Sequence, residues 1–126
     1  MTSPPRVHPA QLGLRFVLEV AALVLIGRGA ARQVPEAWAT FAALGAPALA
    51  AALWVTFAVR GDPSRSGRAP VPVPGPVRLL LEVAVFGAGA VSLVSEGQHG
   101  LAVVYGALVV AHHVGTTARL RWLLAQ

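Results

Sequence analysis

The chain has no cysteine and no lysine among its 126 residues. Without cysteine it cannot form a disulfide, a thiolate metal site or a thiol redox centre. Charged residues are also scarce, at 12% of the chain, whereas hydrophobic residues make up 56% and the mean hydropathy is +0.66. A soluble domain of this length buries too small a share of its surface to hide so much apolar material. The composition therefore predicts a membrane protein.

The positive charge of the chain is carried by ten arginines against five acidic residues. The net charge of +5 and the isoelectric point near 11.6 are values that nucleic-acid-binding proteins also show. The arginines instead flank apolar segments, as the positive-inside rule requires. We therefore expect the lipid bilayer as the partner, and no nucleic acid. Arginine in place of lysine, with abundant Ala, Gly, Pro and Val, is typical of a GC-rich bacterial genome. For a bacterial protein with apolar helical segments, the expected location is the cytoplasmic (inner) membrane.

Four apolar segments are candidates for membrane spans. Residues 37–59 contain 23 residues without a charge, and a helix of that length covers about 34 Å, enough for a hydrocarbon core of about 30 Å. Residues 101–118 form a second clear span, interrupted only by two adjacent histidines. Residues 12–27 and 77–95 are weaker, because each carries an arginine and a glutamate near its start. Their alternation with the clear spans and the short loops between them favour four spans.

The two weaker segments resemble each other. Residues 14–21 (Leu-Arg-Phe-Val-Leu-Glu-Val-Ala) align with residues 77–84 (Val-Arg-Leu-Leu-Leu-Glu-Val-Ala), with five of eight positions identical at an offset of 63, half the chain. A secretory signal peptide is the alternative for the first segment. Arg15 and Glu19 inside its apolar region argue against that alternative, as does the recurrence of the motif in mid-chain. The pattern indicates an internal duplication.

The predicted fold class is an all-α membrane protein with four transmembrane helices arranged as two parallel two-helix repeats. A single domain, 1–126, would contain repeat one at about 12–59, a Pro-rich cytoplasmic linker at 60–76 and repeat two at about 77–124. Eight arginines fall on one side of this topology and two on the other, so both termini should be cytoplasmic. The two repeats should be related by a pseudo-two-fold axis along the membrane normal. The prolines of the linker favour polyproline II geometry.

The repeated Arg-x-x-x-Glu motif supplies the main candidate site residues, Arg15 with Glu19 and Arg78 with Glu82. A carboxylate within hydrocarbon is costly and is rarely left unpaired. Each arginine can reach the glutamate one turn further on, and Arg15 could equally bridge to Glu82, and Arg78 to Glu19. One interpretation is a symmetric polar clamp between the first and third helices. The other is that the glutamates bind a proton or a cationic substrate.

His112 and His113 complete the candidate polar cluster, because their depth in the fourth helix is similar to that of both glutamates. Adjacent residues point about 100° apart, so only one histidine can face squarely inward. In the alternative, one histidine bonds a neighbouring helix and the other lies at the helix flank. A di-iron site would need Glu-x-x-His, but the relevant positions hold Ala22 and Val85. We expect no metal, no cofactor and no catalytic residue.

Small residues predict close helix packing. Ala42, Ala46 and Ala50 share a helix face, and residues 87–90 read Gly-Ala-Gly-Ala. Such surfaces let neighbouring backbones approach closely and would allow a homo-oligomer. Pro47, in the middle of its span, predicts a kink or a freed carbonyl.

Four segments have a distinctive pattern in addition to the four spans: 14–19 (Leu-Arg-Phe-Val-Leu-Glu), 45–47 (Gly-Ala-Pro), 53–57 (Leu-Trp-Val-Thr-Phe) and 78–87 (Arg-Leu-Leu-Leu-Glu-Val-Ala-Val-Phe-Gly). In these segments the chain resembles the YrdB-like family of small bacterial inner-membrane proteins of unknown function. The resemblance covers nearly the whole chain, and its Arg, Glu, Pro and Trp positions are the discriminating ones. It implies a four-helix fold and a membrane location, and it supplies no activity.

The small multidrug transporters are similar in architecture, with four helices and a glutamate in the first. This chain departs from them in having two glutamates related by an internal repeat and no matching motif around Glu19. The expected function is thus a non-enzymatic structural or accessory component of the inner membrane. The alternative is a small proton-linked transporter or permease, of unknown substrate, using Glu19 and Glu82 with His112 or His113. A third hypothesis, an enzyme acting on a lipid or quinone, is not supported, because the sequence contains no convincing set of catalytic residues.

Overall fold

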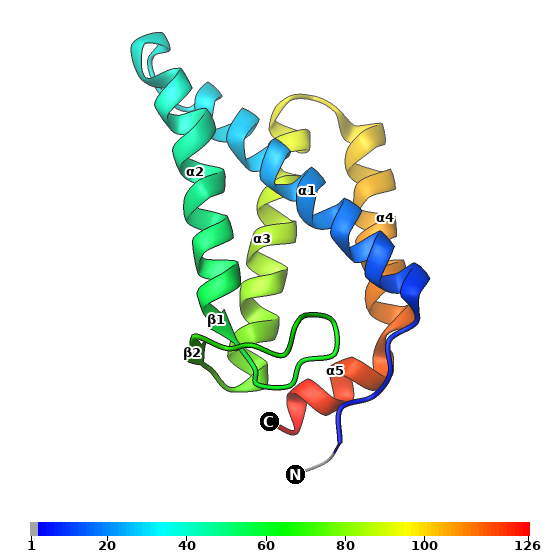
Figure 1. The fold of residues 1–126 in the computed structure, drawn as a ribbon. Coiled ribbons are helices and arrows are strands. Elements are labelled where there is room, and N and C mark those ends of the chain that lie inside the picture. Colours follow the sequence, from blue (N-terminus) through cyan, green and yellow to red (C-terminus); the bar gives the residue numbers. More distant parts are fainter. Residues whose placement is uncertain (1–2) are drawn as a thin grey trace.

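The computed structural model describes residues 3–126, and this part of the chain is mostly helical (Figure 1). Five helices and one pair of short strands make up its regular structure. The helices are α1 (Pro9–Arg32), α2 (Glu36–Thr56), α3 (Gly75–Ser95), α4 (His99–Gly115) and α5 (Thr117–Leu124). The strands are β1 (Phe57–Ala58) and β2 (Val71–Pro72), which pair in parallel.

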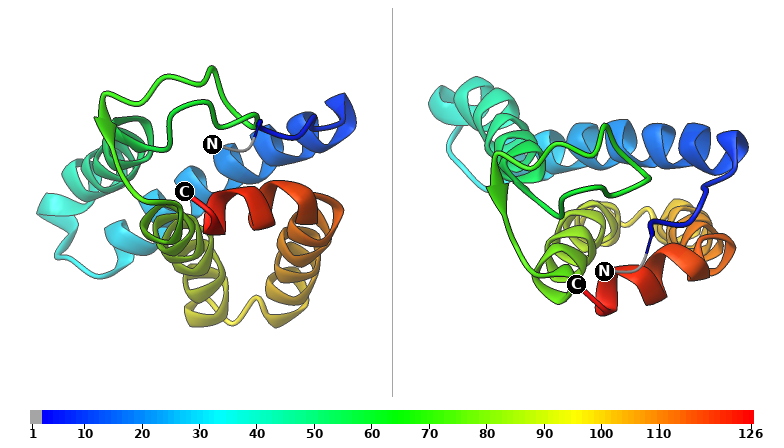
Figure 2. Two further views of the ribbon diagram at one scale, coloured as in Figure 1. Left: turned by 90° about the horizontal axis from the view of Figure 1, so that it is seen from below. Right: turned by 60° about the horizontal axis from the view of Figure 1, so that its bottom comes forward.

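Helix α1 crosses obliquely over the other long helices, packing mainly against α2 and α3 (Figure 1). The loop between β1 and β2 and helix α5 lie at one end of the bundle, which we call the loop end. The turns joining α1 to α2 and α3 to α4 lie at the opposite end, the hairpin end. Seen from the loop end, α5 runs from α4 across the bundle toward α3 (Figure 2). Both termini of the described chain are therefore on the side of the central loop, as the predicted topology requires.

Proline and glycine set most helix ends. Pro9 occupies the first turn of α1, where its missing N–H leaves no hydrogen bond unmade, and the His8 Nδ1 accepts from the Ala10 N–H at 3.1 Å. Pro76 has the equivalent place in α3. The turn after α3 uses Gly97 at φ +74°, a conformation that side chains other than glycine rarely adopt. Helices α1 and α3 consequently begin three and two residues before the segments expected from hydropathy.

The fourth expected segment, residues 101–118, is broken. Helix α4 ends at Gly115 and α5 turns away from it by 71°. Thr116 lies at the break, where its hydroxyl donates to the His112 carbonyl at 2.8 Å. The sequence becomes polar at the break, with Thr116, Thr117 and Arg119, but the expected segment ran on through it to residue 118.

Helices α1, α2 and α3 are each long and apolar enough to cross a membrane, and α4 with α5 makes a fourth candidate if the bent pair is one span. Large apolar side chains cover the outside of these helices. Phe41, Leu44 and Val103 are each about 70% exposed, at 71%, 69% and 71%. Soluble monomers rarely expose contiguous apolar surface on this scale. The surface is therefore compatible with a membrane protein.

The apolar core lies between α1, α2, α3 and α4. Its buried members are Leu18, Ala22, Trp54, Val85, Phe86, Leu93 and Tyr105. Helices α1 and α2 approach most closely at Gly27, where a Cβ would come within 2.6 Å of the Ala43 carbonyl oxygen. That carbonyl is the one left without a helical donor by Pro47, four residues later. The freed carbonyl predicted at Pro47 thus serves helix packing.

The linker folds onto the loop end instead of extending away from it. Val73 donates its N–H to the Ala58 carbonyl at 2.9 Å, and Gly61 donates to Gly67 at 3.0 Å. Residues 71–72, expected in polyproline II geometry, pair with β1 in the neighbouring extended conformation. At the start of α3, a side chain on Gly75 would overlap the carbonyl of Leu123, so α3 and α5 meet backbone to backbone.

Candidate functional site

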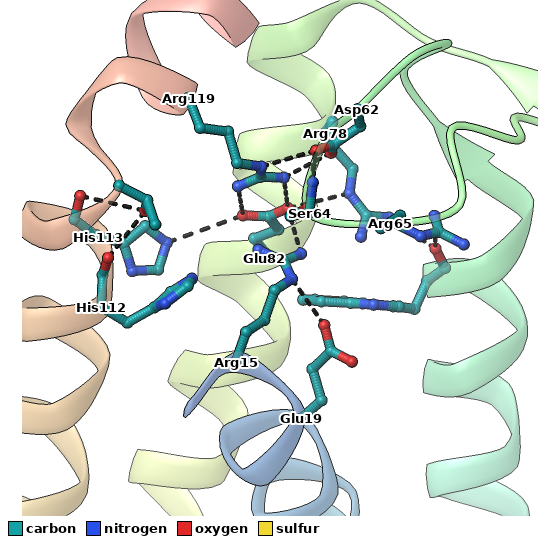
Figure 3. A network of polar contacts seen from close by, with 12 residues as sticks. Arg15, Glu19, Asp62, Ser64, Arg65, Arg78, Glu82, His112, His113 and Arg119 are labelled. Carbon is teal, nitrogen blue, oxygen red and sulfur yellow. Dashed lines mark hydrogen bonds and ion pairs between the residues drawn. The ribbon is translucent and has the colours of Figure 1, made fainter. Parts of the chain in front are cut away.

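A buried network of charged side chains occupies the loop end of the bundle (Figure 3). It joins α1, the central loop, α3 and α5. Its members are Arg15, Glu19, Asp62, Arg78, Glu82 and Arg119, with His113 at its side. The side chains of Arg78, Glu82 and Arg119 have no exposed surface. Three cations and three carboxylates make the network electrically balanced when His113 is neutral.

Glu82 is the centre of the network, because three arginines from three helices donate to its carboxylate. Arg15 Nη2 lies 2.8 Å from Oε1, and Arg78 Nε lies 3.2 Å from the same oxygen. Arg119 binds both oxygens, at 2.7 Å to Oε1 and 3.1 Å to Oε2. Such bidentate, charge-assisted contacts are the strongest hydrogen bonds that side chains make. A fully buried carboxylate with this many partners is held as a structural anion.

Arg119 also fixes the central loop. Its Nε and Nη2 donate to the two carboxylate oxygens of Asp62, at 2.8 and 2.6 Å. Asp62 lies outside the apolar helices and accepts further bonds from the Ser64 N–H and hydroxyl, at 3.0 and 2.8 Å. Burial acts to raise the pKa of Asp62, but the hydrogen bonds and charge of Arg119, with Ser64, outweigh it and lower the pKa below its ordinary value. The carboxylate is thus held ionised.

Trp54 lies between the network and the end of α2. The guanidinium carbons of Arg78 and Arg15 lie 4.4 and 5.1 Å from the centre of its ring. One N–H group of each, Arg78 Nη2 and Arg15 Nη1, is buried without a hydrogen-bond partner, and the negative face of the indole offers these cations a partial substitute. The carbonyl of Trp54 accepts from Arg78 Nη1 at 2.7 Å and from Arg65 Nη1 at 2.9 Å. These two arginines donate to a carbonyl that the end of α2 leaves without a helical partner, and their positive charge stabilises the negative end of the helix dipole.

The two histidines have different surroundings. His113 Nδ1 donates to the Val109 carbonyl at 2.8 Å, whereas its Nε2 lies 3.8 Å from Glu82 Oε2, beyond hydrogen-bond distance. His112 Nδ1 instead lies 3.2 Å from Gln11 Oε1 on α1. His112 therefore makes the contact with a neighbouring helix that the alternative interpretation required of one histidine, while His113 faces the network.

The structure brings together most of the residues that the sequence singled out. Arg15 bridges Glu19 at 2.8 Å and Glu82 at 2.8 Å, so the expected contact of Arg15 with Glu82 is present. Among the ion pairs of residues 3–126, Arg78 pairs with Glu82 and not with Glu19. Glu19 remains at the edge of the network with 27% of its side chain exposed. The two motifs thus converge, but on one glutamate.

Two central members, Asp62 and Arg119, were missed as site residues. Asp62 is the single aspartate of the sequence, and it is followed by Pro63 and Ser64, a pattern typical of a tight turn capped by the carboxylate. That pattern predicts a local turn, but it does not predict that the Asp62 carboxylate binds Arg119. Arg119 entered the sequence interpretation only as a marker of orientation. Among the described residues, no group of three histidines, cysteines or acids is placed to hold a metal ion.

Comparison with known proteins gives the family. A family model described as a protein of unknown function (DUF2568) matches residues 13–110. The uncharacterised protein YrdB of Bacillus subtilis (strain 168) is 31% identical over 128 residues, covering 96% of this chain and 98% of that protein. The chain belongs to the YrdB-like family. No solved structure matches it.

The DUF2568 family model extends from α1 into α4 and includes both Arg-x-x-x-Glu motifs and Asp62. It stops before His112, His113 and Arg119. The resemblance found from the sequence is thereby confirmed, and the family is one of unknown function. The chemistry of the site has to be argued from its geometry.

Proposed function

We propose that this YrdB-like chain is a non-enzymatic integral protein of the bacterial cytoplasmic membrane, acting as a structural or accessory component. The observation that supports this proposal is the burial of the Glu82 carboxylate among three arginines. This carboxylate is fully buried and is bound by Arg15, Arg78 and Arg119, so a substrate would have to displace several charge-assisted bonds to reach it. A group held in this way locks helices together.

In the proposed topology, α1 to α4 are four spans and α5 lies along the cytoplasmic interface. Helix α4 has 17 residues, or about 25 Å at 1.5 Å per residue, which is at the short end for a span. The sharp bend after it supports assigning α5 to the interface. The loop end, with its arginines, would face the cytoplasm, and both termini with it.

We further propose that α1–α2 and α3–α4 are two parallel repeats of one ancestral helix pair. Support comes from the matching eight-residue segments at the start of α1 and α3 and from the convergence of both arginines, Arg15 and Arg78, on one site. The repeats differ beyond the second helix of each, since α2 leads into the loop and α4 into α5.

A second candidate, a small proton-linked transporter, is favoured by one observation on Glu19. A cavity of about 180 Å³ between α1, α2 and α3 is lined by Glu19, Trp54 and Val85, among others. Glu19 is partly exposed and pairs with Arg15 through one carboxylate oxygen. A proton or small cation reaching this cavity would meet Glu19 before the buried Glu82.

Membrane topology tests the first part of the proposal. The chain would be expressed in a bacterium with a reporter that is active only in the cytoplasm, fused at either terminus in turn. We expect the protein in the membrane fraction after alkaline washing and an active reporter at both ends. Recovery in the soluble fraction, or inactivity of both reporters, would contradict the proposal.

Transport assays separate the two candidates. Purified protein would be reconstituted into liposomes with a pH gradient, and proton flux would be followed with a pH-sensitive dye alone and with a panel of small cations. We expect no flux above that of empty liposomes for the wild type. Flux that disappears in Glu19→Gln but persists in Glu36→Gln, an exposed glutamate at the start of α2, would establish the transporter instead.

A further inference from the structure

An elongated groove lies between α3 and α4, on the outside of the bundle. Its cavity volume is about 500 Å³, within the range of about 300–1,000 Å³ that small-molecule sites have. Val83, Val110 and Val114 on its walls are 58%, 62% and 68% exposed, so the groove opens outward. Of the charge network and the histidine beside it, His113 alone lines this groove.

Small residues form part of the groove lining. Gly87 and Ala90 line it from α3, and Gly106 lines it from α4. A Cβ placed on Gly87 or on Gly106 would meet no atom within 4 Å. Neither glycine is therefore required for contact between the two helices, and the space beside each is open.

The groove has polarity along its length. Tyr105 and Ala90 lie toward the hairpin end, where the lining is apolar apart from the Tyr105 hydroxyl, which donates to the Phe86 carbonyl at 3.0 Å. His113 and Thr117 lie at the loop end. Thr117 and Arg121 are both exposed and stand one turn apart on α5, so they share a helix face. An apolar channel thus ends beside a hydroxyl and a surface cation.

We propose that this groove binds one acyl chain of an anionic phospholipid, whose headgroup lies at the α4–α5 bend beside Thr117 and Arg121. The proposal rests on the membrane location given under Proposed function. In that topology the groove faces hydrocarbon and its polar end lies at the cytoplasmic headgroup level, where anionic lipids meet arginine side chains. Tail and headgroup would then each meet complementary chemistry.

Charge complementarity favours a lipid over a second copy of this chain. Copies inserted in the same direction would bring their arginine-rich loop ends together, and the chain carries a net charge of +5. Like charges across an interface oppose association. An anionic headgroup instead reduces the positive charge at that end.

Photolabelling tests the occupant. The protein would be reconstituted into vesicles of phosphatidylethanolamine and phosphatidylglycerol containing a phosphatidylglycerol with a diazirine at the end of one acyl chain. After irradiation, labelled peptides would be mapped by mass spectrometry. We expect labelling concentrated on the apolar part of the groove, at Ala90, Tyr105 and Gly106. Labelling spread evenly over the outward faces of all helices would overturn the proposal.

Gly106→Phe places a large side chain at the groove from a position where a Cβ meets nothing within 4 Å, and Gly45→Phe is its matched control. Gly45 is an exposed glycine on α2 where a Cβ also meets nothing within 4 Å. We expect Gly106→Phe to lose most of the groove labelling, Gly45→Phe to keep it, and both to unfold at the wild-type temperature. Groove labelling unchanged in Gly106→Phe would refute the site.

Headgroup choice is tested with Arg121→Gln and with a phosphatidylcholine carrying the same diazirine chain. Wild type should prefer the phosphatidylglycerol probe by about fivefold, the factor expected for one surface cation near an anionic lipid, and Arg121→Gln should lose that preference. Equal labelling by both probes in the wild type would remove the anionic headgroup from the proposal.

Because the chain has no cysteine, Val110→Cys provides a clean test for the rival occupant. An efficient disulfide dimer in vesicles, formed at the expense of photolabelling, would show that a second copy fills the groove. Flotation of the same vesicles measures incorporation separately. Failure to float would count against the membrane location, whereas incorporated protein without groove labelling would count against the lipid site alone.

Discussion

Glu19 and Glu82 occupy the same place in two copies of one motif, yet their environments differ. Glu82 has no exposed surface and receives Arg15, Arg78 and Arg119. Glu19 is 27% exposed and is paired with Arg15. The same position of the motif thus has different surroundings in its two copies: one glutamate is enclosed as the centre of the network, and the other lies beside a small cavity.

The difference arises from the segments that pack over each motif. Helix α3, which carries Glu82, is covered at the loop end by α5 and by the Asp62 turn, and both are joined through Arg119 (Figure 3). Arg119 comes from α5, which follows both copies of the motif in the chain. The two copies therefore differ through the segments that pack over them, while α1 and α3 keep the common Arg-x-x-x-Glu pattern.

The largest expected effect comes from Glu82→Gln. Removing the central carboxylate leaves three arginines close together without their shared counter-ion, and breaking buried pairs in this way costs about 3–5 kcal/mol. We expect a large fall in the unfolding temperature of the purified protein in detergent. Glu82→Gln with wild-type stability would show that the network does not hold the helices together.

Next in size is Asp62→Asn, which weakens the attachment of the loop to Arg119. Hydrogen bonds between charged groups contribute about 1.5–3 kcal/mol, so the loop should open more often and trypsin should cut after Arg65 or Arg68 at least about tenfold faster. Ser66→Ala, at an exposed position of the same loop, is the control. Equal cleavage rates in the two variants would mean that the Asp62–Arg119 pair does not restrain the loop.

Acid should produce a smaller version of the same opening. The pKa of Asp62 is lowered in the folded protein, so its contribution to stability is complete above the ordinary value near 3.8 and is lost as pH falls through the lowered value. Hydrogen exchange at the Gly61 amide, corrected for the intrinsic rate, should therefore accelerate only below about pH 4. Asp62→Asn should abolish this acid response; its persistence in that variant would assign the effect to another group.

The smallest effect is expected from Glu19→Gln, the direct counterpart of the Glu82 variant. Glu19 is the partly exposed member of its pair with Arg15, and ion pairs at the surface contribute about 0.2–1 kcal/mol. Arg15 also keeps its bond to Glu82 when Glu19 is neutral. The unfolding temperature should fall slightly or not at all. A loss as large as that of Glu82→Gln would mean that the two motifs are energetically equivalent despite their different burial.

The sequence predicted the helices because a span must be long and apolar, and it predicted Arg15, Glu19, Arg78 and Glu82 because charges in such segments are costly. Those inferences use only local composition. The partnership of Asp62 and Arg119 joins residues 57 positions apart. It depends on the direction that α5 takes after the bend at Thr116 and on the path of the loop, and hydropathy predicts neither of these. The asymmetry of the two glutamates was hidden for the same reason.

Arg119 also imposes an order on biosynthesis. It lies 37 residues after Glu82 in the chain, whereas Arg15 and Arg78 precede Glu82. During synthesis, Glu82 is therefore made after two of its arginines and before the third. The network can close only after α4 has been made and α5 has folded back onto the loop end. A chain interrupted within α4 would leave Glu82 and Asp62 without the arginine that joins them.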